Sequence, residues 1–167
     1  MLDWALDQDK HPVYIAIPSG PVVHAEGPVR TNFDALNTYE VTRKGSKVAV
    51  LALGDFYDLG EKTVEALSST LGIEATLVKP YFASGVDQNL LDNLVKDHDV
   101  IVTIEDGIIE GGWGQNIASY LGTSSARVLN YGVKKAFYDR VNIADLMRES
   151  HLDPELIAAD VKQVLGL

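Results

Sequence analysis

The 167-residue chain contains no cysteine, which excludes several kinds of chemistry at once. Without thiols it forms no disulfide bond, no thiolate nucleophile and no zinc–thiolate site. It also lacks an apolar run long enough to span a membrane, and its acidic first seven residues lack the positive charge of a signal peptide. We therefore expect a cytoplasmic protein without a membrane partner.

Positive charge is scarce as well. Fourteen Lys and Arg residues face 24 Asp and Glu residues, which gives a net charge of −10 at pH 7. A field of this sign repels polyanions, so we expect no nucleic-acid partner. Lys134, Lys135 and Arg140 form a local basic cluster. This cluster could bind a small anion, but a solvated surface is the simpler interpretation.

What the chain does have is a regular alternation of apolar runs and helix signals after residue 46. The strand-like runs cover residues 48–53, 75–78, 100–104 and 127–129. The helix signals are an Asp58–Glu61 capping pair, N-cap residues Asp87, Asn142 and Asp153, and a stop at Gly72. This alternation predicts a parallel sheet with helices on both faces.

The first 46 residues follow another pattern. Residues 3–10 resemble the end of a helix, residues 13–17 a strand, and residues 22–36 a loop or linker without periodicity. Residues 39–43 alternate like an edge or antiparallel strand. The predicted fold class is therefore α/β, a three-layer α/β/α domain whose mostly parallel five-stranded sheet has one antiparallel edge strand.

The junction at residues 105–114 is the most informative stretch. Its glycines resemble the start of a dinucleotide fingerprint, but Ile117 replaces the third glycine, and nearby carboxylates would oppose a pyrophosphate. A tight strand-to-helix turn, with Trp113 packed beneath it or at an interface, is the better interpretation. The candidate structural or interface turn comprises Gly54, Asp55, Glu105, Asp106, Gly107, Gly111, Gly112, Trp113 and Gly114.

The adjacent carboxylates Glu105 and Asp106 make a poor acid–base pair, because neighbouring residues of a strand usually point apart. We expect Asp106 to cap the following turn; alternatively, one of the two orients a site in a neighbouring domain. The four histidines are scattered, and His98 is expected in a solvated turn. No serine has the strand–elbow–helix setting of a hydrolase. The residues therefore predict no catalytic, cofactor-binding or metal site in this chain.

Residues 98–114 resemble, almost residue for residue, a stretch of the C-terminal domain of thiamine diphosphate-dependent enzymes of the transketolase group. The similarity is to the 1-deoxy-D-xylulose-5-phosphate synthase family in particular. Residues 128–132 and 153–157 are similar to that family's tail. Residues 1–5 and 11–20 resemble the last helix and strand of its preceding pyrimidine-binding domain.

This resemblance implies three parts: residues 1–21 as a remnant of the pyrimidine-binding domain, 22–37 as a linker, and 38–167 as a transketolase-type C-terminal domain. Such enzymes bind thiamine diphosphate and Mg²⁺ in upstream domains, usually across a homodimer. The parent would then be a transferase that condenses pyruvate and glyceraldehyde 3-phosphate with decarboxylation, in isoprenoid precursor synthesis. The resemblance implies that this chain alone is an inactive fragment whose partners are those upstream domains, and that Met1 is either an internal methionine or an introduced start.

Two departures from the family concern the acceptor substrate. Ala16 and Ser19 stand where the synthase usually carries phosphate-binding arginines, and Tyr81 and Ser84 replace its arginine and lysine after the second core strand. The C-terminal domain of a transketolase, or of a β-type subunit of a 2-oxo acid dehydrogenase, therefore stays open as an alternative. A dimerisation or regulatory domain is an alternative of another class.

Overall fold

The computed structural model describes residues 1–17 and 29–167, which divide into two compact units, residues 1–36 and 37–167. Ser19, His24, the Gly27–Pro28 pair and the early part of the predicted linker lie outside the described residues.

Residues 1–17 and 29–36 of the first unit contain one short helix, α1 (Leu2–Asp7), with no buried residue. Trp4 anchors it: the indole Nε1 donates to Asp34 Oδ1 at 2.8 Å, and its ring meets Phe33 edge-on at 5.8 Å between centroids. The prediction of a strand at residues 13–17 is wrong: the structure has no strand in this segment, and Tyr14 is 92% exposed. A β-branched run becomes a strand only when a neighbouring strand accepts its hydrogen bonds.

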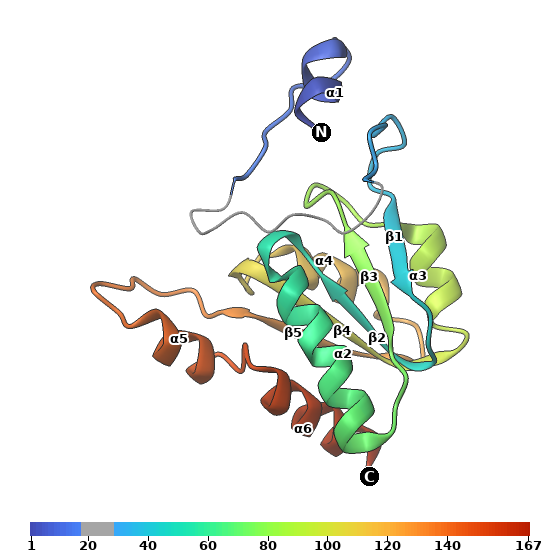
Figure 1. The fold of residues 1–167 in the computed structure, drawn as a ribbon, viewed down its shortest axis with the longest axis vertical. Coiled ribbons are helices and arrows are strands. Elements are labelled where there is room, and N and C mark those ends of the chain that lie inside the picture. The colour runs from blue at the N-terminus through green and yellow to red at the C-terminus, as the bar shows by residue number, and fades with distance from the viewer. Residues whose placement is uncertain (18–28) are drawn as a thin grey trace. The chain divides into compact units, whose positions relative to one another are not determined.

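The second unit is a five-stranded sheet covered by helices on both faces (Figure 1). Its strands are β1 (Tyr39–Arg43), β2 (Lys47–Ala52), β3 (Thr76–Pro80), β4 (His98–Ile108) and β5 (Arg127–Val133). Its helices are the 3₁₀ turn η1 (Gly54–Phe56), α2 (Tyr57–Leu71), α3 (Gln88–Leu94), α4 (Trp113–Tyr120), α5 (Ile143–Glu149) and α6 (Pro154–Leu165). The strand order is β1-β3-β2-β4-β5; β1 pairs antiparallel with β3, and the other pairs are parallel. The predicted fold class is confirmed.

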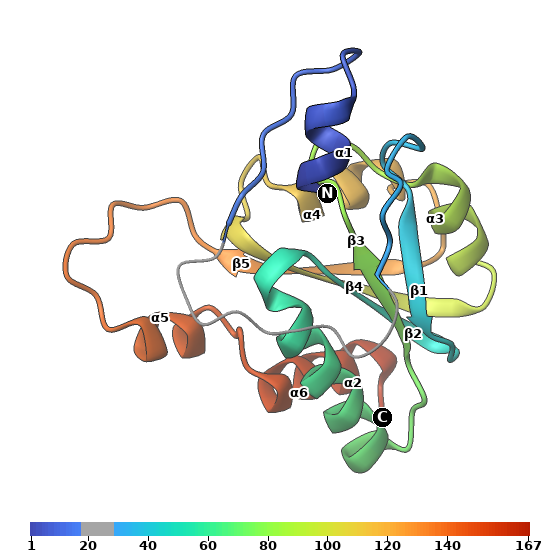
Figure 2. The ribbon, with the colours of Figure 1, turned by 45° about the horizontal axis from the view of Figure 1, so that its top comes forward.

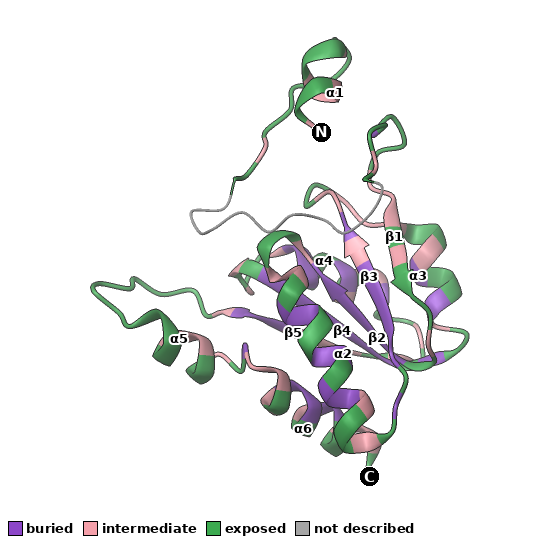
Figure 3. Cartoon of the chain, in the orientation of Figure 1, coloured by how far each residue is buried: buried purple, intermediate pink, exposed green. Residues whose placement is uncertain are grey.

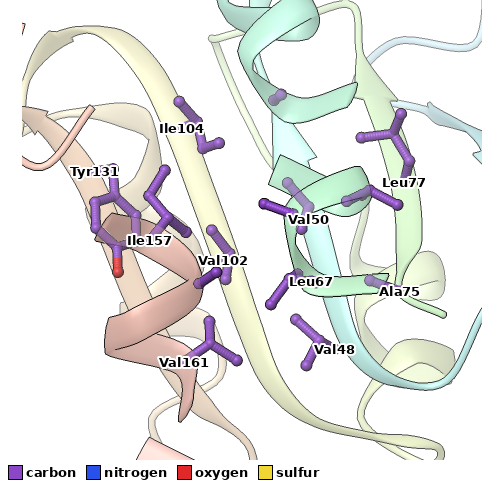
Figure 4. Packing of buried hydrophobic residues seen from close by; sticks show 14 of the residues in the cluster. Val48, Val50, Leu67, Ala75, Leu77, Val102, Ile104, Tyr131, Ile157 and Val161 are labelled. Atoms are coloured by element: carbon purple, nitrogen blue, oxygen red, sulfur yellow. The ribbon is translucent and has the colours of Figure 1, made fainter. Parts of the chain in front are cut away.

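Two apolar layers hold the helices on the sheet. On one face, Val48 and Val50 of β2 and Val102 of β4 pack with Leu67 of α2 and Ile157 of α6 (Figure 4). On the other face, alternate residues of the same strands pack against α3 and α4; they include Ala49, Leu51, Ile101, Leu91 and Ile117. Figure 2 shows α2 and α6 on the same side of the sheet, and Figure 3 shows the buried central strands. Burial on both faces explains why β2 is apolar from Val48 to Ala52.

The ends of the helices follow local sequence signals, with one exception. Asp87, Asn142 and Asp153 each accept a backbone hydrogen bond at the start of their helices, and Gly72 ends α2 with φ of 65°. Asp58 does not cap a helix, because the η1 turn starts α2 earlier, at Tyr57. Asp58 instead lies inside the first turn, where it accepts from Lys62 Nζ at 2.6 Å.

His98 is buried and does not lie in a solvated turn as expected. It begins β4 with 8% of its surface exposed. Its Nδ1 lies 2.7 Å from the Leu94 carbonyl oxygen and its Nε2 2.7 Å from Thr76 Oγ1, which also accepts from the Gly45 N–H. His98 therefore ties β4 to β3 and to the end of α3 as a core residue.

Candidate functional site

The turn that follows β4 is built around one buried carboxylate. Glu105 is 5% exposed; its Oε2 accepts the Trp113 N–H at 2.8 Å and its Oε1 the Gly114 N–H at 2.9 Å. These are the first N–H groups of α4, which have no partner within the helix. Asp106 is exposed, so the prediction that Asp106 caps this turn is wrong. The alternation of side chains along β4 points Glu105 inward toward α4 and Asp106 outward.

The glycines of the turn make room for that carboxylate. A Cβ atom on Gly112 would lie 2.4 Å from the Ile108 carbonyl oxygen and 2.6 Å from Glu105 Oε1. One on Gly114 would lie 2.4 Å from Thr103 Oγ1, and Gly111 has a φ of 81°. The glycines that resemble a nucleotide fingerprint thus allow an internal acid, not a phosphate, to reach the helix N-terminus.

Trp113 connects α4 to the far edge of the sheet. Its side chain is buried, and its Nε1 donates to the Tyr39 hydroxyl at 2.9 Å. The Tyr39 hydroxyl donates in turn to the Gly85 carbonyl oxygen at 2.9 Å, and the two rings meet edge-on at 5.9 Å between centroids. Trp113 therefore packs within the unit, beneath the turn, and fixes the position of α4 against β1.

Tyr39 makes the fold sensitive to alkaline pH. Burial raises the pKa of the Tyr39 hydroxyl from 10.0 to about 12, against the smaller opposing effect of its hydrogen bond with Trp113. The unfolded chain therefore loses this proton at lower pH than the folded chain, so stability is full below pH of about 10 and falls as the pH approaches 12. The free energy of unfolding, measured with urea from about pH 9 to about pH 11, on either side of the ordinary tyrosine pKa of about 10, should show this decrease.

Tyr39→Phe provides the comparison for that measurement. The variant should be less stable at neutral pH, because the Trp113 indole N–H loses its acceptor, but its stability should fall less steeply above pH of about 10. Burial also raises the pKa of Tyr131, which donates to Asp160 Oδ2 at 3.0 Å, so part of the alkaline loss remains. Equal slopes in the two proteins would contradict this role of Tyr39.

The structure brings some of the predicted turn residues together and separates others. Glu105, Gly112, Trp113 and Gly114 form one hydrogen-bonded unit. Gly54 and Asp55 follow the neighbouring strand β2. Leu53, just before them, is joined to β4 because its N–H donates to the Ile104 carbonyl oxygen at 2.9 Å. Gly54 and Asp55 are both exposed. Among the contacts of the described residues, neither forms a hydrogen bond with the Glu105 carboxylate.

Three residues of the site were not foreseen: Tyr39, Thr103 and Asn130. Thr103 Oγ1 donates to Asn130 Oδ1 at 2.7 Å, and both side chains lie close to Gly114. The sequence contains a signal for two of these residues. Thr103 is a polar residue within an apolar run, and Asn130 is a polar residue directly after another apolar run. Tyr39 is 74 residues from Trp113, so no local pattern links them.

The N-terminus of α4 does not fit the diphosphate of a cofactor. The N-terminus of α4 is already satisfied by Glu105, and residues 1–17 and 29–167 contain no group of three or more His, Cys, Asp or Glu side chains that could hold a metal. Among the helices described, none is long and apolar enough to cross a bilayer. Ala16, one of the four residues that depart from the synthase pattern, is exposed.

Comparisons with known proteins agree with this arrangement. The family model for the transketolase C-terminal domain matches residues 37–157. The 1-deoxy-D-xylulose-5-phosphate synthase of Clostridium tetani is 28% identical over 99% of this chain and 26% of its own length. The synthase of Pseudoalteromonas translucida is 33% identical over 93% of this chain and 24% of its own length.

Solved structures share the fold. One described as split gene transketolase, inactive beta4 tetramer, superposes with a TM-score of 0.74 at 24% identity, covering 87% of this chain and 47% of the other. Compared with the two synthases, the chain spans about a quarter of their length, and their catalytic domain is absent from it. The resemblance seen in residues 98–114 is confirmed: the chain belongs to the transketolase C-terminal domain family.

Proposed function

We propose that this chain serves as the C-terminal, non-catalytic part of a cytoplasmic, homodimeric 1-deoxy-D-xylulose-5-phosphate synthase. The whole enzyme would condense pyruvate with glyceraldehyde 3-phosphate and release carbon dioxide. The observation that carries the proposal is the extent of the alignment with the Clostridium tetani synthase. It covers 99% of the chain and therefore continues before residue 37, where the general family match begins.

In this proposal the upstream domains bind thiamine diphosphate and Mg²⁺, and the cofactor supplies the carbanion chemistry. Residues 38–167 contribute a rigid supporting domain, residues 22–37 the linker, and residues 1–21 the end of the pyrimidine-binding domain. The exposure of Tyr14 and Ile17 supports the last assignment, because large apolar side chains left exposed close together indicate a surface that another domain covers.

The exposed side of the turn is proposed as an interface. Asp55, Asp106 and Ile108 lie at the carboxyl ends of adjacent strands, and Ile108 is 40% exposed. On its buried side, the turn is held by the hydrogen bonds that Glu105 accepts from Trp113 and Gly114, so the exposed side has a fixed conformation.

A chimera tests the proposed activity. The C-terminal quarter of the Clostridium tetani synthase is replaced by this chain, and condensation of pyruvate with glyceraldehyde 3-phosphate is measured. We expect condensation by the chimera and none by the synthase truncated before the replaced quarter. Because Ala16 and Ser19 replace phosphate-binding arginines, we expect the KM for glyceraldehyde 3-phosphate to rise and Ala16→Arg to lower it again.

The controls separate misfolding from a wrong assignment. Asp99→Asn in the chimera should leave the rate unchanged at saturating substrate, because its side chain is exposed at the start of β4, the opposite end of the strand from the proposed interface. A folded chimera that binds thiamine diphosphate but does not condense these substrates would contradict the proposal. If that chimera instead transferred two-carbon units between sugar phosphates, the transketolase alternative would replace it.

A further inference from the structure

The segment between β5 and α5, which we call the arm (residues 134–143), is the most exposed part of the second unit. Every residue from 134 to 145 is exposed, and α5 begins within this run without a buried residue. Figures 1 and 2 both show the segment running away from the sheet before it returns at α5.

The arm carries four large apolar side chains that are wholly or partly exposed. Phe137 is fully exposed, Ile143 is 74% exposed, and Tyr138 and Val141 are about two-fifths exposed (42% and 41%). Single exposed apolar residues are ordinary, but four within ten residues indicate an interaction surface.

Several contacts fix the path of the arm. The Lys135 N–H donates to Glu110 Oε2 at 2.9 Å, and the Tyr138 hydroxyl donates to the Lys134 carbonyl oxygen at 2.8 Å. At the other end, the Asn142 side chain caps α5. A segment held in this way loses less conformational entropy on binding than a free loop.

The arm differs in charge from the rest of the molecule. Lys134, Lys135 and Arg140 outweigh Asp139, so the arm carries +2, and the remaining residues carry −12 of the total −10. An exposed acidic rim, formed by Asp55, Asp106 and Glu110, lies at the carboxyl ends of β2 and β4 around the half-exposed Ile108. The arm therefore matches this rim in both charge and apolar character.

The two surfaces are adjacent on one edge of the sheet. Ile108 pairs with Val133, the last residue of β5, so the arm starts beside the rim. A twofold axis at this edge can place each arm over the rim of the other copy, which is the self-complementary arrangement of a closed dimer. We propose that the arm of one copy binds the acidic rim and Ile108 of a second copy of this chain, and reciprocally. This inference rests on the homodimer of the proposed function.

Charge reversal tests the contact with the chain as it exists. The arm variant carries Lys134→Glu and Lys135→Glu, and the rim variant carries Asp55→Lys and Asp106→Lys. We expect the unmodified chain to dimerise with rising concentration in sedimentation velocity, and each variant to dimerise at least about tenfold more weakly. An equimolar mixture of the two variants should recover the dimer, because each arm then meets a rim of opposite charge.

Phe137→Ser combined with Ile143→Ser tests the apolar part and should also weaken dimerisation. Circular dichroism should be unchanged in all variants, since the substituted side chains are exposed. A strict monomer at every concentration would overturn the proposal and assign the arm to another domain of a longer protein. A dimer that the arm variant does not weaken would overturn it as well. Neither result bears on the chimera's condensation rate, which tests the proposed function separately.

Discussion

Replacing Glu105 by alanine is expected to lower the free energy of unfolding by about 3 kcal/mol, because the buried Trp113 and Gly114 N–H groups lose their acceptor. A buried donor left unsatisfied costs about 1–3 kcal/mol, and both residues are buried. Glu105→Gln should cost less, about 1–2 kcal/mol, since one amide oxygen remains to accept. Urea unfolding followed by tryptophan fluorescence measures both differences.

Asp106→Asn is the matched control for this comparison. It changes the neighbouring carboxylate, which is exposed, and should alter stability by less than about 0.5 kcal/mol. If Glu105→Ala were as stable as Asp106→Asn, the buried carboxylate would not be the cap of α4, and the account of the turn would be wrong.

The role of Glu105 distinguishes this glycine-rich turn from one that holds a ligand phosphate. A helix N-terminus attracts negative charge, and in many α/β domains a ligand phosphate supplies it. Here the chain supplies its own carboxylate, and Gly112 and Gly114 leave space for that carboxylate alone. The turn is therefore a fixed element of the fold, and its exposed side is available for contact with other protein surfaces.

Much of the fold could be predicted from local sequence. The parallel strands are short apolar runs, and the caps Asp87, Asn142 and Asp153 act within three residues of their own positions. Such signals depend only on residues that are close in the chain, so they can be recognised in a single sequence. The glycines around Trp113 likewise predicted a tight turn between β4 and α4.

The expectations that proved wrong depend on tertiary contacts. His98 has polar neighbours in the sequence but is buried through bonds to Thr76 and Leu94. The choice between Glu105 and Asp106 depends on which face of β4 meets α4, which the sequence does not specify. Residues 13–17 have the composition of a strand but find no strand to pair with.

Thiamine diphosphate should produce no binding heat with this chain, even with Mg²⁺ present. The helix N-terminus that could hold a diphosphate is filled by Glu105, and the net charge of −10 opposes a polyanion. The part of the chain that the structure describes has no cluster of three or more ligating side chains for a metal ion. It therefore offers no bound Mg²⁺ to hold the diphosphate. The chimera, which has the upstream domains, should bind the cofactor under the same conditions.

Calorimetric titration of the isolated chain with thiamine diphosphate and Mg²⁺ tests the central claim, that this domain supports a reaction centre located in other domains. We predict only heats of dilution for the chain and a saturating isotherm for the chimera. Saturable one-site binding to the folded chain, or conversion of pyruvate by the chain without other domains, would contradict the claim.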